Sequence, residues 1–110
     1  MKQILLNKNV TAKVDDEDYK LLNLFIWRLW IDHHGYHYAI RDASVSGGLT
    51  ASDTVRIYMH RYVMDVPDTL QECREKFGHV LYVVHKDGNG LNNQRNNLII
   101  SRSSQVDLNT

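Results

Sequence analysis

The stretch Val84-His85-Lys86-Asp87-Gly88-Asn89-Gly90-Leu91-Asn92-Asn93 decides the fold of this chain. The residues before it, 79–84, are rich in β-branched and aromatic side chains and predict a strand that leads into His85. Gly88 and Gly90 follow, and both can adopt the positive φ that a tight loop requires. The pattern therefore predicts a histidine at the end of a strand, next to a glycine-rich loop.

The chain continues with a second strand and a last helix. Residues 92–97 are polar enough to form a turn, and residues 98–100 predict a short strand. Ser101 or Ser103 can cap a final helix. The predicted order is strand, histidine, loop, turn, strand and helix.

Working backward from this stretch, residues 1–66 predict a strand-rich module. Its expected elements are strands at 4–6 and 10–14, a helix capped by Asp15, two antiparallel strands on either side of Gly35 within 27–41, a strand at 54–59 and a short helix before Pro67. Leu70, Cys73 and Phe77 recur at helical spacing and predict another helix, which Gly78 ends.

Composition limits the classes of protein to consider. A chain of 110 residues has room for one compact domain, and its zero net charge is unlike the basic balance usual in proteins that grip DNA phosphates. The single cysteine, Cys73, excludes an internal disulfide, and the sequence has neither a leader pattern nor an apolar run of about 18 residues. We expect a cytoplasmic protein that does not enter a membrane.

Taken together, these residues resemble the HNH endonucleases of phages and bacteria, which share the small ββα-metal (His-Me finger) fold. Residues 80–106 resemble the family core, with His85 at its first motif histidine and Asn93 and Asn97 at its asparagines. Residues 1–18, 27–41 and 57–61 resemble the amino-terminal half of small phage HNH proteins. The resemblance implies one α+β domain over residues 1–110. Its antiparallel, strand-rich module at 1–66 precedes a ββα-metal motif at 79–110.

The family also implies roles for these residues. His85 would act as general base on water, Asn93 would pin the loop and Asn97 would orient the histidine. A divalent cation, Mg²⁺ or Mn²⁺, would be held by the residue before the histidine and by one on the last helix. The protein would then act in a bacterial or phage-infected cell.

Both expected ligand positions carry valine. Val84 precedes the histidine, Val106 occupies the helix position, and an isopropyl group has no lone pair for a cation that binds through oxygen. Asp107 is the one alternative ligand, if the helix register differs by one residue. We therefore predict that efficient cleavage has been lost, and no cofactor is assigned.

Other polar residues are candidates for contact with DNA phosphates. These are His60, Arg61, Arg95, Arg28 and Arg41. His33, His34 and His37 surround Gly35, where a turn between strands indicates exposed side chains rather than metal ligands. Trp27 and Trp30 are expected in the core.

Two functional hypotheses follow. In the first, an HNH-type scaffold without efficient catalysis binds DNA or a protein target, for example as an inhibitor or counter-defence factor. In the second, the chain is an active HNH endonuclease of the nicking or homing type, and Arg95 or Arg61 supports the charge that develops on the phosphate. A structural or virion role finds no support in the sequence.

Overall fold

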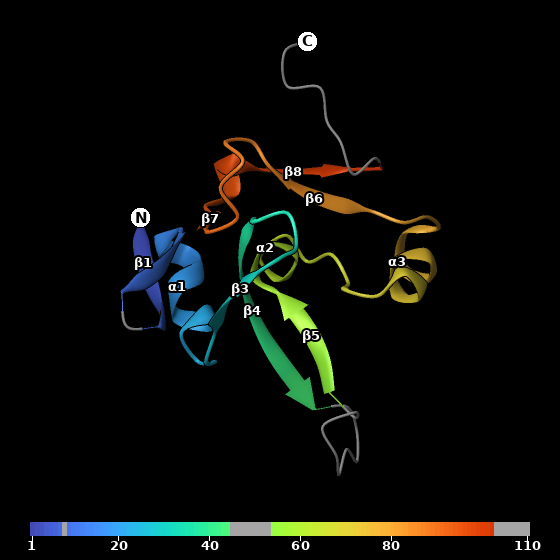
Figure 1. Cartoon of the computed structure of the whole chain (residues 1–110). Helices are drawn as coiled ribbons and strands as arrows, with labels where there is room; N and C mark the ends of the chain where they lie inside the picture. The colour runs from blue at the N-terminus through green and yellow to red at the C-terminus, as the bar shows by residue number, and fades with distance from the viewer. Residues whose placement is uncertain (8, 45–53, 103–110) are drawn as a thin grey trace.

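Residues 1–7, 9–44 and 54–102 are described by a computed structural model, in which they form an α+β fold of short helices and small sheets (Figure 1). The elements are β1 (Lys2–Asn7), β2 (Val10–Val14), α1 (Asp16–Leu22), β3 (Arg28–Ile31), β4 (His37–Ser44), β5 (Thr54–Tyr58), α2 (Met59–Val63), α3 (Leu70–Phe77), β6 (Tyr82–His85), β7 (Asn92–Asn93), the 3-10 helix η2 (Arg95–Asn97) and β8 (Leu98–Ser101). The α+β class predicted from the sequence is confirmed.

The strands form two antiparallel groups and one mixed sheet. β3, β4 and β5 make an antiparallel meander, and β6 pairs with β8 from Tyr82↔Ser101 to His85↔Leu98. The third sheet has the order β1-β2-β7, and its β2–β7 pair is parallel. The strand pairs within residues 1–66 are all antiparallel in the described part of the chain, as predicted, and the parallel pair links that module to β7.

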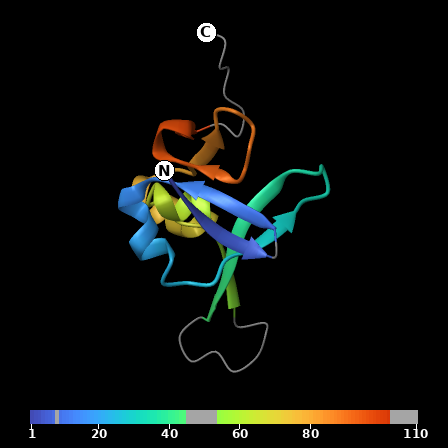
Figure 2. The same cartoon turned by 90° about the vertical axis from the view of Figure 1, so that its left-hand side faces the viewer.

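The parallel β2–β7 pair joins the amino-terminal strands to the segment that follows His85. The Lys13 backbone N–H donates to the Leu91 carbonyl at 2.7 Å, and Val14 pairs with Asn93. Residues 92 and 93, expected in a turn, thus also form a two-residue strand. Figure 2 shows β1 and β2 beside the segment that leads into η2. The loop after His85 is consequently held by the amino-terminal strands.

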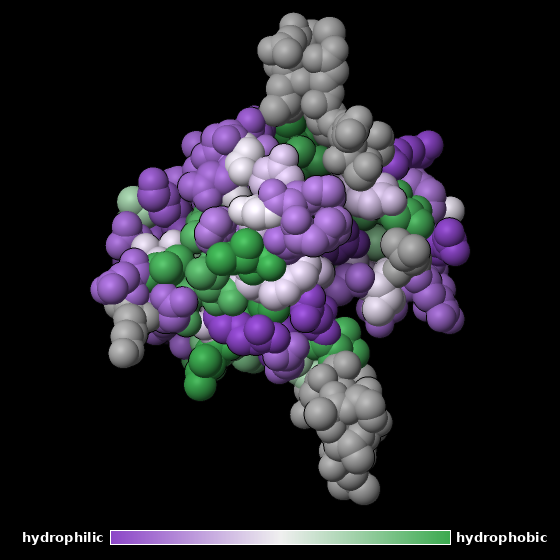
Figure 3. Space-filling view, in the orientation of Figure 1, coloured by the Kyte–Doolittle hydropathy of each residue, from purple (hydrophilic) through white to green (hydrophobic). Residues whose placement is uncertain are grey.

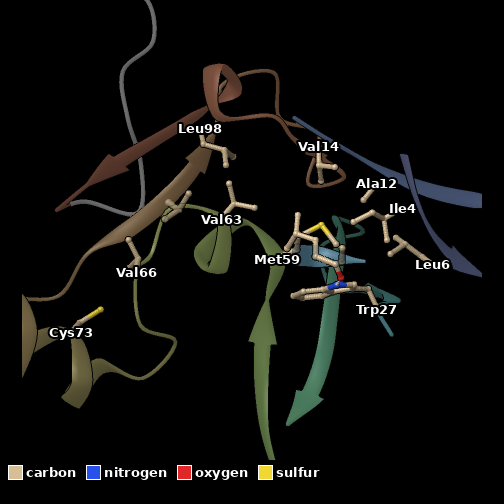
Figure 4. Close-up of a cluster of buried hydrophobic side chains, with 13 residues drawn as sticks. Ile4, Leu6, Ala12, Val14, Trp27, Met59, Val63, Val66, Cys73 and Leu98 are labelled. Atoms are coloured by element: carbon tan, nitrogen blue, oxygen red, sulfur yellow. Dashed lines mark hydrogen bonds between the residues drawn. The ribbon is translucent and has the colours of Figure 1, made fainter. Parts of the chain in front are cut away.

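A single apolar cluster runs through both predicted modules (Figure 4). Ile4 and Val14 from the first sheet pack in the same cluster as Met59 of α2 and as Val83 and Leu98 of the β6–β8 hairpin. Trp27 is 1% exposed, whereas Trp30 is half-buried, so the core prediction holds fully only for Trp27. Cys73 is fully buried.

The two longer helices begin and end differently. Thr69 caps α3 by accepting the Glu72 backbone N–H, and Gly78 ends it at φ +81°. Asp15 precedes α1 as predicted, but its side chain caps no N–H of that helix. The Asp15 carboxylate instead accepts the backbone N–H of Arg95 at 3.1 Å, so it joins α1 to η2.

Helices in the described part of the chain are all too short or too polar to cross a membrane.

Candidate functional site

His85 lies at the end of β6, opposite Leu98 of β8. Side chains alternate along the strand, so Val83 and His85 are buried while Val84 between them is half-buried. His85 is 9% exposed. The strand period therefore turns the histidine toward the interior, and Val84 next to it remains partly exposed.

Asn93 holds the His85 ring. Its Oδ1 lies 2.7 Å from His85 Nε2, and Asn93 is fully buried on β7. The amide oxygen accepts the Nε2 proton, which fixes the tautomer and leaves the Nδ1 lone pair available. No group among the described residues forms a hydrogen bond with Nδ1.

Asn97 pins the loop. Its Oδ1 accepts the Asp87 backbone N–H, and its Nδ2 donates to the Asp87 carboxylate and to the Asn92 carbonyl, all at 2.9–3.1 Å. The predicted roles of the two asparagines were therefore exchanged. The reason is that β7 brings Asn93 beside the histidine, whereas η2 turns Asn97 back toward the loop.

The two loop glycines are required for different reasons. Gly88 has φ +74°, as predicted. Gly90 does not use the positive φ that a glycine permits. A Cβ on Gly90 would lie 1.9 Å from the His37 carbonyl oxygen at the start of β4. Gly90 thus allows the loop to approach the β3–β4 hairpin closely.

A cavity of about 580 Å³ lies against His85. Its described lining comprises His34, Tyr36, Tyr38, His60, Val83, Val84, His85, Gly88 and Gly90. Burial lowers the pKa of His85 below its ordinary value, and the hydrogen bond that its Nε2–H donates to Asn93 partly opposes that shift. A neutral, oriented imidazole at the wall of a cavity can accept a proton near pH 7.

His60 is the neighbour of His85 on a separate element, α2. It is 8% exposed, and its ring centre is 4.8 Å from that of His85. Burial, followed by the nearby His85 and Arg61, lowers the pKa of His60 well below 6.5. Its Nδ1 atom is buried without a hydrogen-bond partner. His60, which was predicted to contact phosphate, thus lines the cavity beside His85.

Arg61 is held inside the protein. Its guanidinium donates to the Pro67 and Leu81 carbonyls and lies 3.8 Å from the Asp68 carboxylate. These contacts tie α2 to the segment before α3 and to the approach to β6. In this arrangement Arg61 has a structural role and is not turned toward a phosphate.

The three other candidate arginines also have partners within the chain. Arg28 pairs with Asp42 at 2.9 Å, and Arg95 pairs with Asp18 at 2.9 Å. Arg41 stacks on the Phe25 ring at 3.9 Å. The structure does not bring these side chains together with His85, because they lie on β3, β4 and η2 and are held by neighbours on other elements.

The residues around His85 do not fit a hard cation such as Mg²⁺. None of the described residues that line the cavity carries a carboxylate. Nearby Asp87 uses its carboxylate to accept from Asn89, Asn92 and Asn97. The predicted last helix, with Val106 and Asp107, lies outside the described residues. The donors present are imidazoles and phenols, whereas Mg²⁺ prefers carboxylate and water oxygens.

Replacing Asn93 with leucine is expected to lower the pKa of His85 further. The substitution removes the acceptor that favours the protonated ring, and it leaves Nε2–H unpaired at a cost of about 1–3 kcal/mol in unfolding free energy. An NMR titration of the imidazole measures the pKa. Asn96→Ala, at an exposed position, is the control and should not change it. An unchanged pKa in Asn93→Leu would contradict the assigned contact.

The stability of the protein is expected to fall below about pH 6.5. Because the folded state disfavours protonated His60, the unfolded chain binds more protons there, and unfolding free energy declines by up to about 1.4 kcal/mol per pH unit for each proton. Well above pH 6.5, His60 binds no proton in either the folded or the unfolded state, so its contribution to the unfolding free energy does not change with pH. Urea unfolding between pH 7.5 and 5.0 measures this slope. Carboxyl groups ordinarily titrate below this interval, so they add little to it. His60→Gln should reduce the slope and leave the contribution of His85, whose pKa is also lowered, while exposed His37→Gln should keep the full slope. Equal stability of the wild-type protein at both pH values contradicts the prediction.

Comparisons with protein-family models, curated proteins and solved structures gave no match to this chain. The functional proposal therefore depends on the contacts that this chain's own residues make.

Proposed function

We propose that this chain is an HNH-type scaffold that has lost efficient metal-dependent DNA cleavage and acts by binding, with a protein target favoured over DNA. The main support is that all four arginines considered for phosphate contact are engaged by the chain's own groups: Arg28 by Asp42, Arg95 by Asp18, Arg61 by backbone carbonyls and Arg41 by Phe25. A protein that binds DNA needs such cations free to displace counterions.

The surface gives secondary support for a protein target. Ile26 is 93% exposed and Leu24 is 73% exposed, in the segment between α1 and β3. Figure 3 shows hydrophobic patches between hydrophilic areas on the face turned to the viewer. Apolar side chains that gather into a contiguous exposed patch are typical of surfaces that bind another protein.

Loss of cleavage can be tested with a supercoiled plasmid in Mg²⁺ or Mn²⁺. The wild-type protein is expected to leave the plasmid intact, because a valine replaces each expected ligand. Val84→Asp combined with Val106→Asn is expected to produce nicking. Adding His85→Ala to that variant should abolish the nicking, which ties the activity to the histidine. Nicking by the wild-type protein that His85→Ala removes would overturn the proposal.

Binding to DNA can be tested separately by gel shift. We expect no shift of duplex DNA at 150 mM salt, about the physiological level. Tight binding that weakens steeply with salt would indicate phosphate contacts. If Arg28→Ala or Arg95→Ala then reduced that binding, DNA would replace protein as the favoured target.

An active endonuclease is the second candidate, and one observation favours it. His85 is anchored at Nε2 by Asn93 and keeps Nδ1 available at a cavity, which is the arrangement a general base needs. The wild-type plasmid assay described above decides between the two candidates.

A further inference from the structure

A groove lies between the three α-helices and shares no described residue with the cavity at His85. Its volume is about 490 Å³, and residues of α1, α2, α3 and the segment between α2 and α3 line it. A smaller cavity of about 50 Å³ continues it between α1 and α2, because Leu21, Tyr62, Val63 and Arg95 line both. The two spaces together are called the helical groove below.

The floor of the helical groove is apolar. Leu21 of α1 lines both parts of the groove and is 52% exposed. Tyr62 of α2 is half-buried beside it, and Val63 and Val66 are buried beneath. An apolar floor that remains partly open to water favours contact with apolar side chains of a partner, since that contact removes the surface from water.

The rim of the helical groove is acidic. Asp65, Asp68 and Glu72 line its larger part. Glu72 is exposed and forms no ion pair with another described residue. Asp65 is exposed and pairs with Lys76, a surface contact of the kind that contributes little and that a partner's cation can replace.

The two cations that line the helical groove are already neutralised. Arg61 is held by the contacts described above, and Arg95 is paired with Asp18 at 2.9 Å. The hydrogen bonds to Asp18, together with the charges of Asp18, Glu17 and Asp15, raise the pKa of Arg95. Acidic groups therefore outnumber the cations at both ends of the groove, which makes it unsuited to phosphates and suited to a basic partner.

We propose that the helical groove binds a basic amphipathic peptide segment of a protein partner, in which lysine or arginine side chains flank apolar ones. The apolar side chains would lie on Leu21 and Tyr62, and the cations would lie near Asp65 and Glu72. This inference rests on the proposed protein-binding function and adds to it the place of binding and the chemistry of the target.

The test uses a fluorescein-labelled peptide of about 14 residues, or four helical turns, with leucines at helical spacing on one face and lysines at the other positions. Fluorescence anisotropy with the full chain measures binding. We expect saturable binding that weakens as the salt concentration rises. A matched peptide with glutamate in place of every lysine should not bind.

Two pairs of exposed substitutions locate the binding surface. Leu21→Ser should weaken binding of the lysine peptide about tenfold, because it removes apolar surface from the floor. Leu5→Ser, at an exposed position on β1, is its control and should bind like the wild type. Glu72→Gln should weaken binding about twofold to fivefold at low salt. Glu75→Gln, on the same helix but outside the groove lining, should have little effect.

Three results would overturn the proposal. These are no binding of the lysine peptide, equal binding of the glutamate peptide, or equal losses in Leu21→Ser and Leu5→Ser. Sedimentation of the protein alone tests a second copy as the occupant: a dimer that Leu21→Ser dissociates would also overturn it. Nicking or salt-dependent DNA binding by the wild-type protein would instead contradict the proposed function, so the two failures remain distinguishable.

Discussion

Replacing Gly90 with alanine is expected to lower the unfolding free energy by about 3 kcal/mol, at the upper end of the usual cost of overpacking. The added Cβ would lie 1.9 Å from the His37 carbonyl oxygen, and both groups belong to backbone that cannot rotate away. The loop or the β3–β4 hairpin would have to shift. Because Asn93 follows on the same loop, its contact with His85 should also be disturbed. Urea unfolding and the His85 NMR signal measure the two effects.

Gly88→Ala is the matched control for this experiment. Gly88 has φ +74°, but its added Cβ would meet nothing within 4 Å. Only the left-handed backbone opposes alanine there, at a cost of about 1–2 kcal/mol. If Gly90→Ala were no more destabilising than Gly88→Ala, the close approach to His37 would not hold in solution.

Replacing Trp27 with alanine is expected to lower the unfolding free energy by about 3–5 kcal/mol, enough to threaten folding of a small domain. The ring is 1% exposed, meets Phe25 and Tyr62 edge-on at 6.0–6.4 Å, and donates its Nε1–H to the Leu22 carbonyl at 2.8 Å. The substitution removes this packing and the shorter of two hydrogen bonds to the Leu22 carbonyl, which also accepts the Phe25 backbone N–H. Urea or thermal unfolding measures the loss.

Two further substitutions separate these contributions. Trp27→Phe keeps an aromatic ring and removes the Nε1–H donor, so it should cost less than Trp27→Ala. Trp30→Ala removes a half-buried ring stacked on Tyr38 and should also cost less. Equal losses at positions 27 and 30 would contradict the assignment of Trp27 to the core.

The pair His60 and His85 joins the two halves of the fold. His60 belongs to α2, directly after the β3–β4–β5 meander, and His85 belongs to the β6–β8 hairpin. Their shared cavity is lined by both halves. Arg61 also ties the two halves together by donating to the Pro67 and Leu81 carbonyls.

Local chemistry made the secondary structure predictable. The helical spacing of Leu70, Cys73 and Phe77, ended by Gly78, predicted α3, and the aromatic residues around Gly35 predicted the β3–β4 hairpin. Such patterns depend on neighbours within a few residues, which the sequence displays directly. The parallel β2–β7 pair left no comparable pattern, because its strand partners are about 80 residues apart.

The sequence by itself determined the strand ending in His85, the loop with Gly88 and the nearby asparagines. Tertiary structure alone decided that Asn93 rather than Asn97 holds the histidine, that Gly90 accommodates His37, and how closely the His60 and His85 rings pack. The physical reason is distance along the chain. Hydrogen bonds and ring contacts between separate elements depend on how those elements pack, whereas turns and strand periods are set by adjacent residues.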